Sequence, residues 1–405
     1  GASLATNKVE NSTKALIDDS TVTNASSIDL TGSSTSEIKT YTIAGGLAAA
    51  GGMGGGVAVA VAGSGAENVI GNKTNALITN STLTITGKLE LTAEDTSIID
   101  SLSVGASVSV AVGGGAGAAV PIGVSLGSNK INNTVLAAIE KSKVTHSSSN
   151  SENSDVNVTA KQSATIKSTA VAASVGAGVG GLGVAVSGAG ALAKNEINNQ
   201  TLAHIVDSTL SITGNMKVTA EDKVTTDGLI VAASVAAAGG GVGGGIALGV
   251  SVVENIIPAT ALTQAKISGG LFKVGGSVAV DASSTGKMNS DVDAVSIGFA
   301  AGSTAGAAAV AGVKASHDLK GKVEAQILGS VNNENSAVSG VTVKASNNVT
   351  SDLDVKSASV AAAVGGIAGA LSVSVASATT TLEPEVSATI RDAKLISSGG
   401  NIAVT

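Results

Sequence analysis

Asn68-Val-Ile-Gly-Asn72 and Asn129-Lys-Ile-Asn-Asn133 are copies of one short motif that recurs along the whole chain. The copies begin at Asn7, Asn68, Asn129, Asn195 and Asn255, and two decayed copies lie near Asp318 and Glu383. Consecutive copies are 60 to 66 residues apart. A period in this range is typical of a solenoid, in which each unit buries its apolar face against its neighbours. We therefore expect residues 1–405 to form a single elongated domain, built from repeats of about 60 residues.

The chain reads as an excised part of a longer repeat protein. Gly1 to Asn7 matches the junction at Gly127-Ser-Asn129, so the sequence begins inside a copy of the repeat. It ends inside another copy at Thr405, and no signal peptide precedes the first repeat.

Composition limits the possible classes of protein. The chain has 53 Gly, no Cys and only 1% aromatic residues, so small side chains must form the interior. Large aromatic residues normally supply much of a core, and without them the interior has to be thin. The lack of cysteine excludes disulfides and thiolate metal sites. Charged residues make up 13% of the chain and the net charge is −7, which argues against a nucleic-acid partner.

The first half of each repeat predicts three short strands. In the second copy, residues 76–81, 83–85 and 87–93 alternate between apolar and polar side chains, and Asn, Ser and Gly lie between these runs. That alternation indicates half-buried strands joined by turns. Three short strands with tight corners predict a triangular path for the chain.

The second half of each repeat predicts a pair of long strands. Residues 101–112 and 118–126 place Val and Leu on one face and Ser, Gly and Ala on the other, with a glycine bend between them. The small-residue face would let two backbones approach closely. Residues 229–253 are also long and uncharged enough for a membrane-spanning helix. Their glycine clusters cost about 1 kcal/mol per residue in a helix, so we expect buried strands instead.

Two ways of stacking the repeats remain open. If one repeat forms one wide coil, then Asn7, Asn68, Asn129, Asn195 and Asn255 form a structural ladder of stacked amides. If a repeat contains three narrow coils, equivalent asparagines lie about 14 Å apart and cannot touch. The constant phase of Asn favours the wide coil. Seven wide coils would be about 34 Å tall, whereas some twenty narrow coils would extend to about 95 Å.

The sequence offers few residues for chemistry. Gly176 to Gly181 has the glycine spacing of a dinucleotide site, but no helix or ribose-binding acid follows it. The three histidines stand alone, without a recurring nucleophile or carboxylate, and we expect His204 to face outward: they are His146, His204 and His317. We therefore expect no catalytic residues, no cofactor and no metal site, and hence no enzyme.

Two acidic pairs recur at one corner of the repeat, Glu94-Asp95 and Glu221-Asp222. Two carboxylates alone are a weak ligand set for calcium. We interpret both pairs as a solvated turn rather than a cation site.

The repeat consensus is Asn-x-Ile-x-Asn, then Ala-x-Ile, then Ser-x-Leu-x-Ile-x-Gly-x-Val-x-Ala, followed by a Val/Gly/Ala run. It resembles the repeat region of leukotoxin-type filamentous adhesins, which are large bacterial proteins exported by two-partner or autotransporter pathways. The resemblance covers nearly the whole chain and is clearest from Asn7 to Asn255. It implies a right-handed parallel β-helix, an extracellular or cell-surface location, and a role in virulence through host-cell attachment or damage.

The first functional hypothesis is a structural shaft of such an adhesin or toxin, whose partner is a host-cell surface or an extracellular polymer. The alternative is a membrane-active, pore-forming segment that uses the Gly/Ala/Val hairpins, because residues 101–128 carry no charge. A weaker option is recognition of ice or a polymer by the short row Thr82, Thr84 and Thr86. Open strand edges at the ends of the stack also predict end-to-end self-association.

Overall fold

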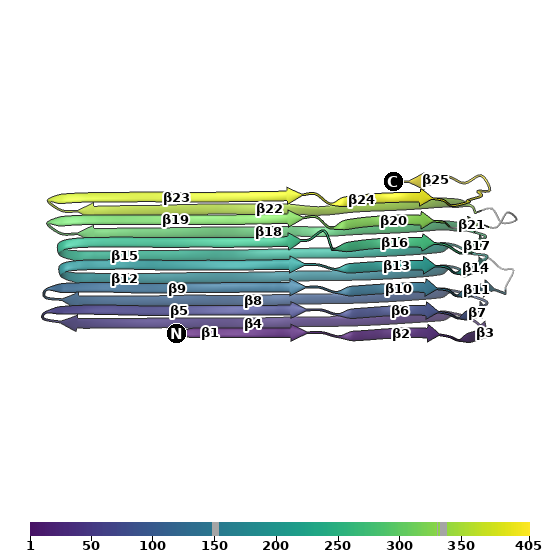
Figure 1. The fold of residues 1–405 in the computed structure, drawn as a ribbon, viewed down its shortest axis with the longest axis horizontal. Helices are drawn as coiled ribbons and strands as arrows, with labels where there is room; N and C mark the ends of the chain where they lie inside the picture. Colours follow the sequence, from purple (N-terminus) through teal and green to yellow (C-terminus); the bar gives the residue numbers. More distant parts are fainter. Residues whose placement is uncertain (148–153, 330, 333–337) are drawn as a thin grey trace.

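The computed structural model describes residues 1–147, 154–329, 331–332 and 338–405, and these residues form parallel β-strands without any helix. The long strands lie side by side as a stack in Figure 1, with the N-terminal strand at one end of the stack and the C-terminal strands at the other. The all-β prediction is confirmed. Residues 229–253, which are long enough for a spanning helix, lie within the strand β15 (Met216–Ile257).

The strands belong to three parallel sheets. The largest sheet has 12 strands: β1 (Ala2–Val9), β4 (Ile28–Gly52), β5 (Gly55–Ile70), β8 (Leu89–Gly113), β9 (Ala116–Ile131), β12 (Val156–Ile197), β15, β18 (Ser277–Ala301), β19 (Thr304–Leu319), β22 (Gly340–Val364), β23 (Ile367–Leu382) and β25 (Ile402–Val404). The second has 7 strands: β2 (Ser12–Asp18), β6 (Lys73–Thr79), β10 (Thr134–Glu140), β13 (Gln200–Val206), β16 (Leu262–Ser268), β20 (Lys322–Leu328) and β24 (Glu385–Arg391). The third has 6 strands: β3 (Thr21–Ala25), β7 (Thr82–Ile85), β11 (Lys143–His146), β14 (Thr209–Ile212), β17 (Leu271–Val274) and β21 (Val331–Asn332).

Each strand pairs with the equivalent strand one repeat further along the chain. Asn68 is the register partner of Asn129, and Asn129 is the partner of Asn195. One repeat therefore makes one layer of the stack, which is the arrangement of the wide-coil alternative. Layers built this way are about 4.8 Å apart.

The register corrects two of the anchors that we read from the sequence. The partner of Asn255 is His317, and the partner of His317 is Thr380. The acids Asp318 and Glu383 therefore do not continue the row of asparagines. Alternate residues of a strand face opposite sides, so Asp318 points away from the asparagine row, although its polarity suggested a match.

Of the three short strands expected in each repeat, two are present and the third is not a separate strand. In the second copy, β6 and β7 are short, and the third expected strand is the beginning of the 25-residue strand β8. Inward side chains of these three strands share an aliphatic core, in which Ile78, Leu83 and Leu91 are fully buried. We call this end of the layer the triangle, because three strands enclose that core. We refer to this part of the stack as the three-sheet core.

The corner between the second and third sheets uses left-handed backbone at one position in every layer. Asn80 has φ 49° and Asp207 has φ 48°, and Gly269 takes the same conformation with φ 64°. Asn, Asp and Gly are the residues that adopt this region most easily. Asn, Asp and Gly thus favour the tight corner in most layers, whereas Lys141 takes the same conformation in the third copy with φ 47°.

Beyond the triangle, the layer narrows to two long strands that pack face to face. The second copy illustrates the arrangement, because β8 runs outward, Gly114 and Gly115 form the bend, and β9 returns. We call this part the two-layer region, which comprises residues 101–126 in the second copy and their register partners in the other copies.

In the second copy, the side chains buried in the two-layer region are small, whereas later layers bury Ile230 and Val292 at the position of Ser103. Ser103, Ser107 and Ala111 face inward, whereas Val108 and Val112 are 36% and 52% exposed on the outer face. The expected strand pair with a small-residue face is present. Our expectation that these strands are buried is wrong for the Val/Leu face, because the returning strand packs against the small-residue face and leaves the Val/Leu face on the outside.

Glycine substitutions will measure this close approach. A Cβ at Gly105 would lie 2.1 Å from the carbonyl oxygen of Val124 on the returning strand. Gly105→Ala is therefore expected to lower the free energy of unfolding by about 1–3 kcal/mol, because the two strands must separate. Gly188→Ala is the control, since no atom lies within 4 Å of that Cβ position. Urea unfolding followed by far-ultraviolet circular dichroism compares them, and equal stabilities would contradict the close-packing account.

Candidate functional site

The most ordered polar feature of the interior is a row of asparagines at the inner face of the returning strands. Each Nδ2 donates to the Oδ1 of the asparagine in the next layer, at 2.9, 2.8, 2.9 and 2.8 Å in chain order. The row consists of Asn7, Asn68, Asn129, Asn195 and Asn255, so the structure brings together all five residues predicted from the sequence. Four of them are almost completely buried, the exception being Asn7 at the end of the stack.

Buried amides of this kind hold the register between layers. An unpaired polar group in an apolar interior costs about 1–3 kcal/mol, so a shift of one residue would leave these amides without partners. Thr40 connects the ladder to the opposite strand, since its Oγ1 lies 2.6 Å from Asn68 Oδ1.

His317 continues the asparagine ladder into the next layer. Asn255 Nδ2 donates to His317 Nε2 at 3.0 Å, and His317 Nδ1 lies 2.7 Å from Ser351 Oγ. Burial lowers the pKa of His317 to about 4, so the imidazole is neutral. Because Nε2 accepts the hydrogen bond from Asn255, the ring hydrogen is on Nδ1, which donates to Ser351 Oγ. A neutral histidine therefore replaces the carboxamide in this layer.

A second asparagine row uses the last residue of the repeat motif, and our sequence analysis did not predict it. The backbone N–H of Asn11 donates to Asn72 Oδ1 at 3.1 Å, and the backbone N–H of Asn72 donates to Asn133 Oδ1 at 2.7 Å. Asn133 in turn donates its backbone N–H to Asn199 Oδ1 at 3.3 Å. The recurrence of Asn at both ends of Asn-x-Ile-x-Asn was the available signal.

The second row surrounds a buried carboxylate. Asp95 is fully buried and accepts hydrogen bonds from Asn72 Nδ2 at 2.9 Å and Asn133 Nδ2 at 2.7 Å. It also accepts from Ser97 Oγ at 2.7 Å and from Gln162 Nε2 at 3.1 Å. Our interpretation of Glu94-Asp95 as a solvated turn is therefore wrong for Asp95. Strand alternation turns Glu94 outward and Asp95 inward, so the two acids of the pair lie in different environments.

Asp222 lies at the same inward position two layers further on, but it has fewer partners. It accepts a hydrogen bond from Asn199 Nδ2 at 3.3 Å. The next copy has Ala261 where Asn199 would recur, as the backbone bond from Lys322 N to Ala261 O shows. Burial raises the pKa of Asp222 to about 7, so this carboxyl group is largely protonated in mildly acidic solution.

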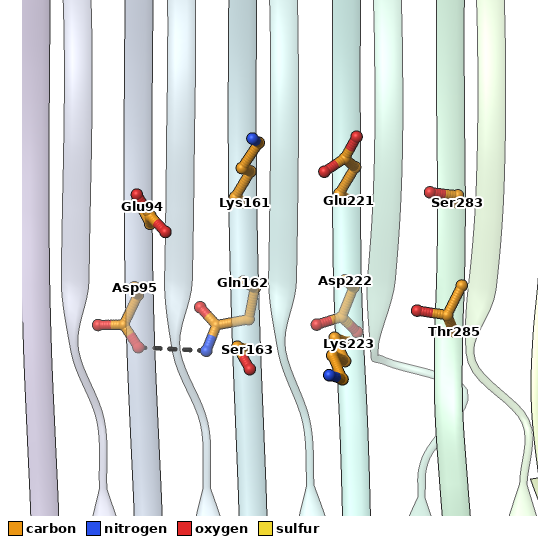
Figure 2. Close-up of a pocket in the computed structure, with 10 residues that line it drawn as sticks. All are labelled: Glu94, Asp95, Lys161, Gln162, Ser163, Glu221, Asp222, Lys223, Ser283 and Thr285. Atoms are coloured by element: carbon orange, nitrogen blue, oxygen red, sulfur yellow. Dashed lines mark hydrogen bonds between the residues drawn. The ribbon is translucent and has the colours of Figure 1, made fainter.

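A hollow of about 380 Å³ opens over these residues. Figure 2 shows its wall, where Lys161 lies between Glu94 and Glu221 on adjacent strands and Gln162 lies between Asp95 and Asp222. Gln162 Oε1 is buried without a hydrogen-bond partner in the described part of the chain. The walls combine both signs of charge, which favours a polar, hydrated surface over a site for one ionic ligand.

The described residues contain no group of three or more His, Cys, Asp or Glu side chains that could hold a metal ion. His204 lies on the outer side of β13, as predicted, and its pKa is lowered to about 4 mainly by burial. Gly176 to Gly181 lies within β12 rather than before a helix, so it lacks the structural context of a dinucleotide site.

No helix in the described residues is long and apolar enough to cross a membrane. Comparisons of the chain with protein-family models, curated proteins and solved structures found no match in any of the three.

Removal of one ladder amide tests its contribution to stability. Asn129→Ala deletes two buried hydrogen bonds and leaves Asn68 Nδ2 and Asn195 Oδ1 without partners. The free energy of unfolding is expected to fall by about 2–4 kcal/mol. Asn132→Ala provides the control because Asn132 is exposed in the neighbouring turn. A ladder variant as stable as this control in chemical unfolding would show that the amides do not hold the layers.

The pH dependence of stability tests Asp222. The folded protein retains this proton up to about pH 7, whereas an unfolded aspartic acid releases it near pH 3.9. Stability from this group is therefore fully present below about pH 4 and is lost as the pH rises to about 7. Asp222→Asn removes the ionisation, so the variant should match the wild type at pH 4 and exceed it at pH 8 by a few kcal/mol.

Thermal unfolding at a series of pH values measures this difference. Asp227→Asn is the matched control, since Asp227 lies on the exposed face of the same strand. A constant difference between Asp222→Asn and the wild type across the pH range would exclude the buried acid as the cause.

Proposed function

We propose that this chain is a structural segment of an extracellular or surface-anchored bacterial adhesin or toxin, folded as a right-handed parallel β-solenoid. Its role is to hold binding regions of a larger protein away from the cell surface, and it performs no catalysis. The repeat pattern resembles that of leukotoxin-type filamentous adhesins, which is the basis for the location and the class of protein.

The observation that carries the proposal is the unbroken match between layers. Every strand of one repeat finds the same partner in the next repeat, for example Ile78 beside Ile139 and Ile139 beside Ile205. Additional repeats could extend such a stack without a change of fold, since each layer contacts only its neighbours. Length is therefore set by repeat number, which suits a spacer between a cell and its target.

The buried ladders support the same role. Asn129 and Asp95 link adjacent layers through side chains as well as backbone. A stack joined in both ways resists local opening, and local opening is what exposes a chain to proteases. A persistent spacer outside the cell needs this resistance more than it needs a binding pocket.

The second candidate is a membrane-active segment, and the exposed apolar faces of the two-layer region favour it. Leu47, Val57 and Leu371 are 81%, 70% and 62% exposed. Side chains of this kind gain free energy on leaving water. Lipid could supply that environment, so release of a vesicle dye distinguishes this candidate from a spacer.

A cell-binding experiment tests the spacer role. The labelled chain is expected to show no saturable binding to host cells, to release no dye from liposomes and to survive limited proteolysis. The same chain fused to a small binding domain of known target should bind through that domain, with the domain alone as control. Saturable binding of the unfused chain would indicate a receptor-binding module, and dye release would support the membrane-active candidate instead.

A further inference from the structure

One outer face of the two-layer region is almost free of charge. We call it the return face. It consists of the outward side chains of residues 55–65 of β5, 116–126 of β9, 182–192 of β12, 242–252 of β15, 304–314 of β19 and 367–377 of β23, which are register partners. Among its described residues Lys314 is the single charged side chain. Ile246, Leu248 and Val250 are 43%, 42% and 50% exposed on it, so bulky apolar side chains cover its centre.

The opposite face of the two-layer region is less uniform. Its later layers carry Asp291 and Asp293 on β18, and Asp354 and Lys356 on β22. These charges occupy the rows that hold Leu229 and Val231 in the preceding layer. The return face is therefore the larger continuous apolar surface of the two.

The return face has ridges and hollows that recur from layer to layer. Gly244, Gly306 and Gly369 are register partners and form the floor of one hollow of about 540 Å³. Gly65 lies in a second hollow of about 550 Å³ beside Leu126. Leu248 belongs to a ridge that continues through its register partners Val310 and Val373. A partner with protruding apolar side chains could fill these hollows.

The size of the return face matches a stable protein interface. Its length along the strands is about 33 Å and its six layers span about 29 Å, which gives about 950 Å². A standard protein–protein interface buries about 800 Å² on each partner. The face is thus large enough for a stable dimer without any other contact.

Its periodicity identifies the partner that fits best. Along each ridge the side chains repeat at the spacing of parallel strands, about 4.8 Å, and a second copy of this chain has the same spacing. In a twofold dimer each patch meets its own equivalent, so one favourable contact recurs in successive layers. Lipid fits less well, because the open edges of the sheet at β4 and β23 would leave backbone groups unpaired in hydrocarbon.

We propose that the return face is a docking surface for a second copy of this chain, with the Leu248 ridge of each copy against the glycine hollows of the other. The pairing is lateral, and it differs from end-to-end association through the sheet edges. This lateral pairing does not depend on the proposed spacer role, although two laterally paired stacks would make a stiffer spacer.

Sedimentation velocity over a wide range of concentration tests the proposal. The wild-type chain should form a dimer, and Leu248→Lys should weaken the dimer by about 100-fold or more, because an unpaired charge would be buried at its centre. Gly306→Val should also weaken it by filling a hollow, and it should fold normally because no atom lies within 4 Å of the added Cβ. Val110→Lys is the control, since Val110 is 39% exposed on the opposite face; it should remain dimeric.

Circular dichroism verifies that each variant is folded before it is compared. A monomeric wild-type chain at all concentrations would overturn the proposal, as would equal effects of Leu248→Lys and Val110→Lys. Association that persists in Leu248→Lys would point to the sheet edges instead. Wild-type protein that remains monomeric but floats with phosphatidylcholine vesicles, and loses this in Leu248→Lys, would assign the face to lipid.

Discussion

The structure depends on one constraint, which is that each strand forms its backbone hydrogen bonds with the equivalent strand one repeat away. This register places like side chains beside like in successive layers, as with Asn68, Asn129 and Asn195. A polar residue can then be buried in every layer, because the next layer supplies its partner. The repeat period and the asparagine ladder are two consequences of the same pairing.

The three-sheet core and the two-layer region of each layer are packed with different kinds of side chain. In the three-sheet core, large aliphatic residues such as Ile139 and Leu91 fill the space between three strands. In the two-layer region, Gly105 and Ser103 let two backbones approach until a Cβ at Gly105 would strike Val124. Where the strands approach this closely, small side chains fill the space between them, and the bulky side chains Val108 and Leu248 are exposed on the outer faces. The surface proposed for a second copy is thus a product of the thin interior.

Two departures from the repeat lie in the buried polar rows. His317 replaces an asparagine and is neutral, while Ala261 replaces another and leaves Asp222 with a hydrogen bond from Asn199 and a pKa raised to about 7. Burial favours the uncharged form of both groups. It therefore lowers the pKa of the base His317 and raises the pKa of the acid Asp222. The later layers therefore respond to pH through groups that the regular layers lack.

The sequence by itself determined the period, the all-β class, the strand pairs and the five asparagines of the first ladder, since strand alternation and a repeated phase are local properties of the chain. It did not determine which face of residues 101–112 is buried. Alternation assigns side chains to two faces, but it does not say against which face the returning strand packs. Only the tertiary structure decided that Asp95 is enclosed by Asn72 and Asn133, because residues distant in the chain supply those donors. Likewise, His317 belongs to the ladder because it is the register partner of Asn255, whereas the repeat motif of the sequence did not indicate a histidine at this position.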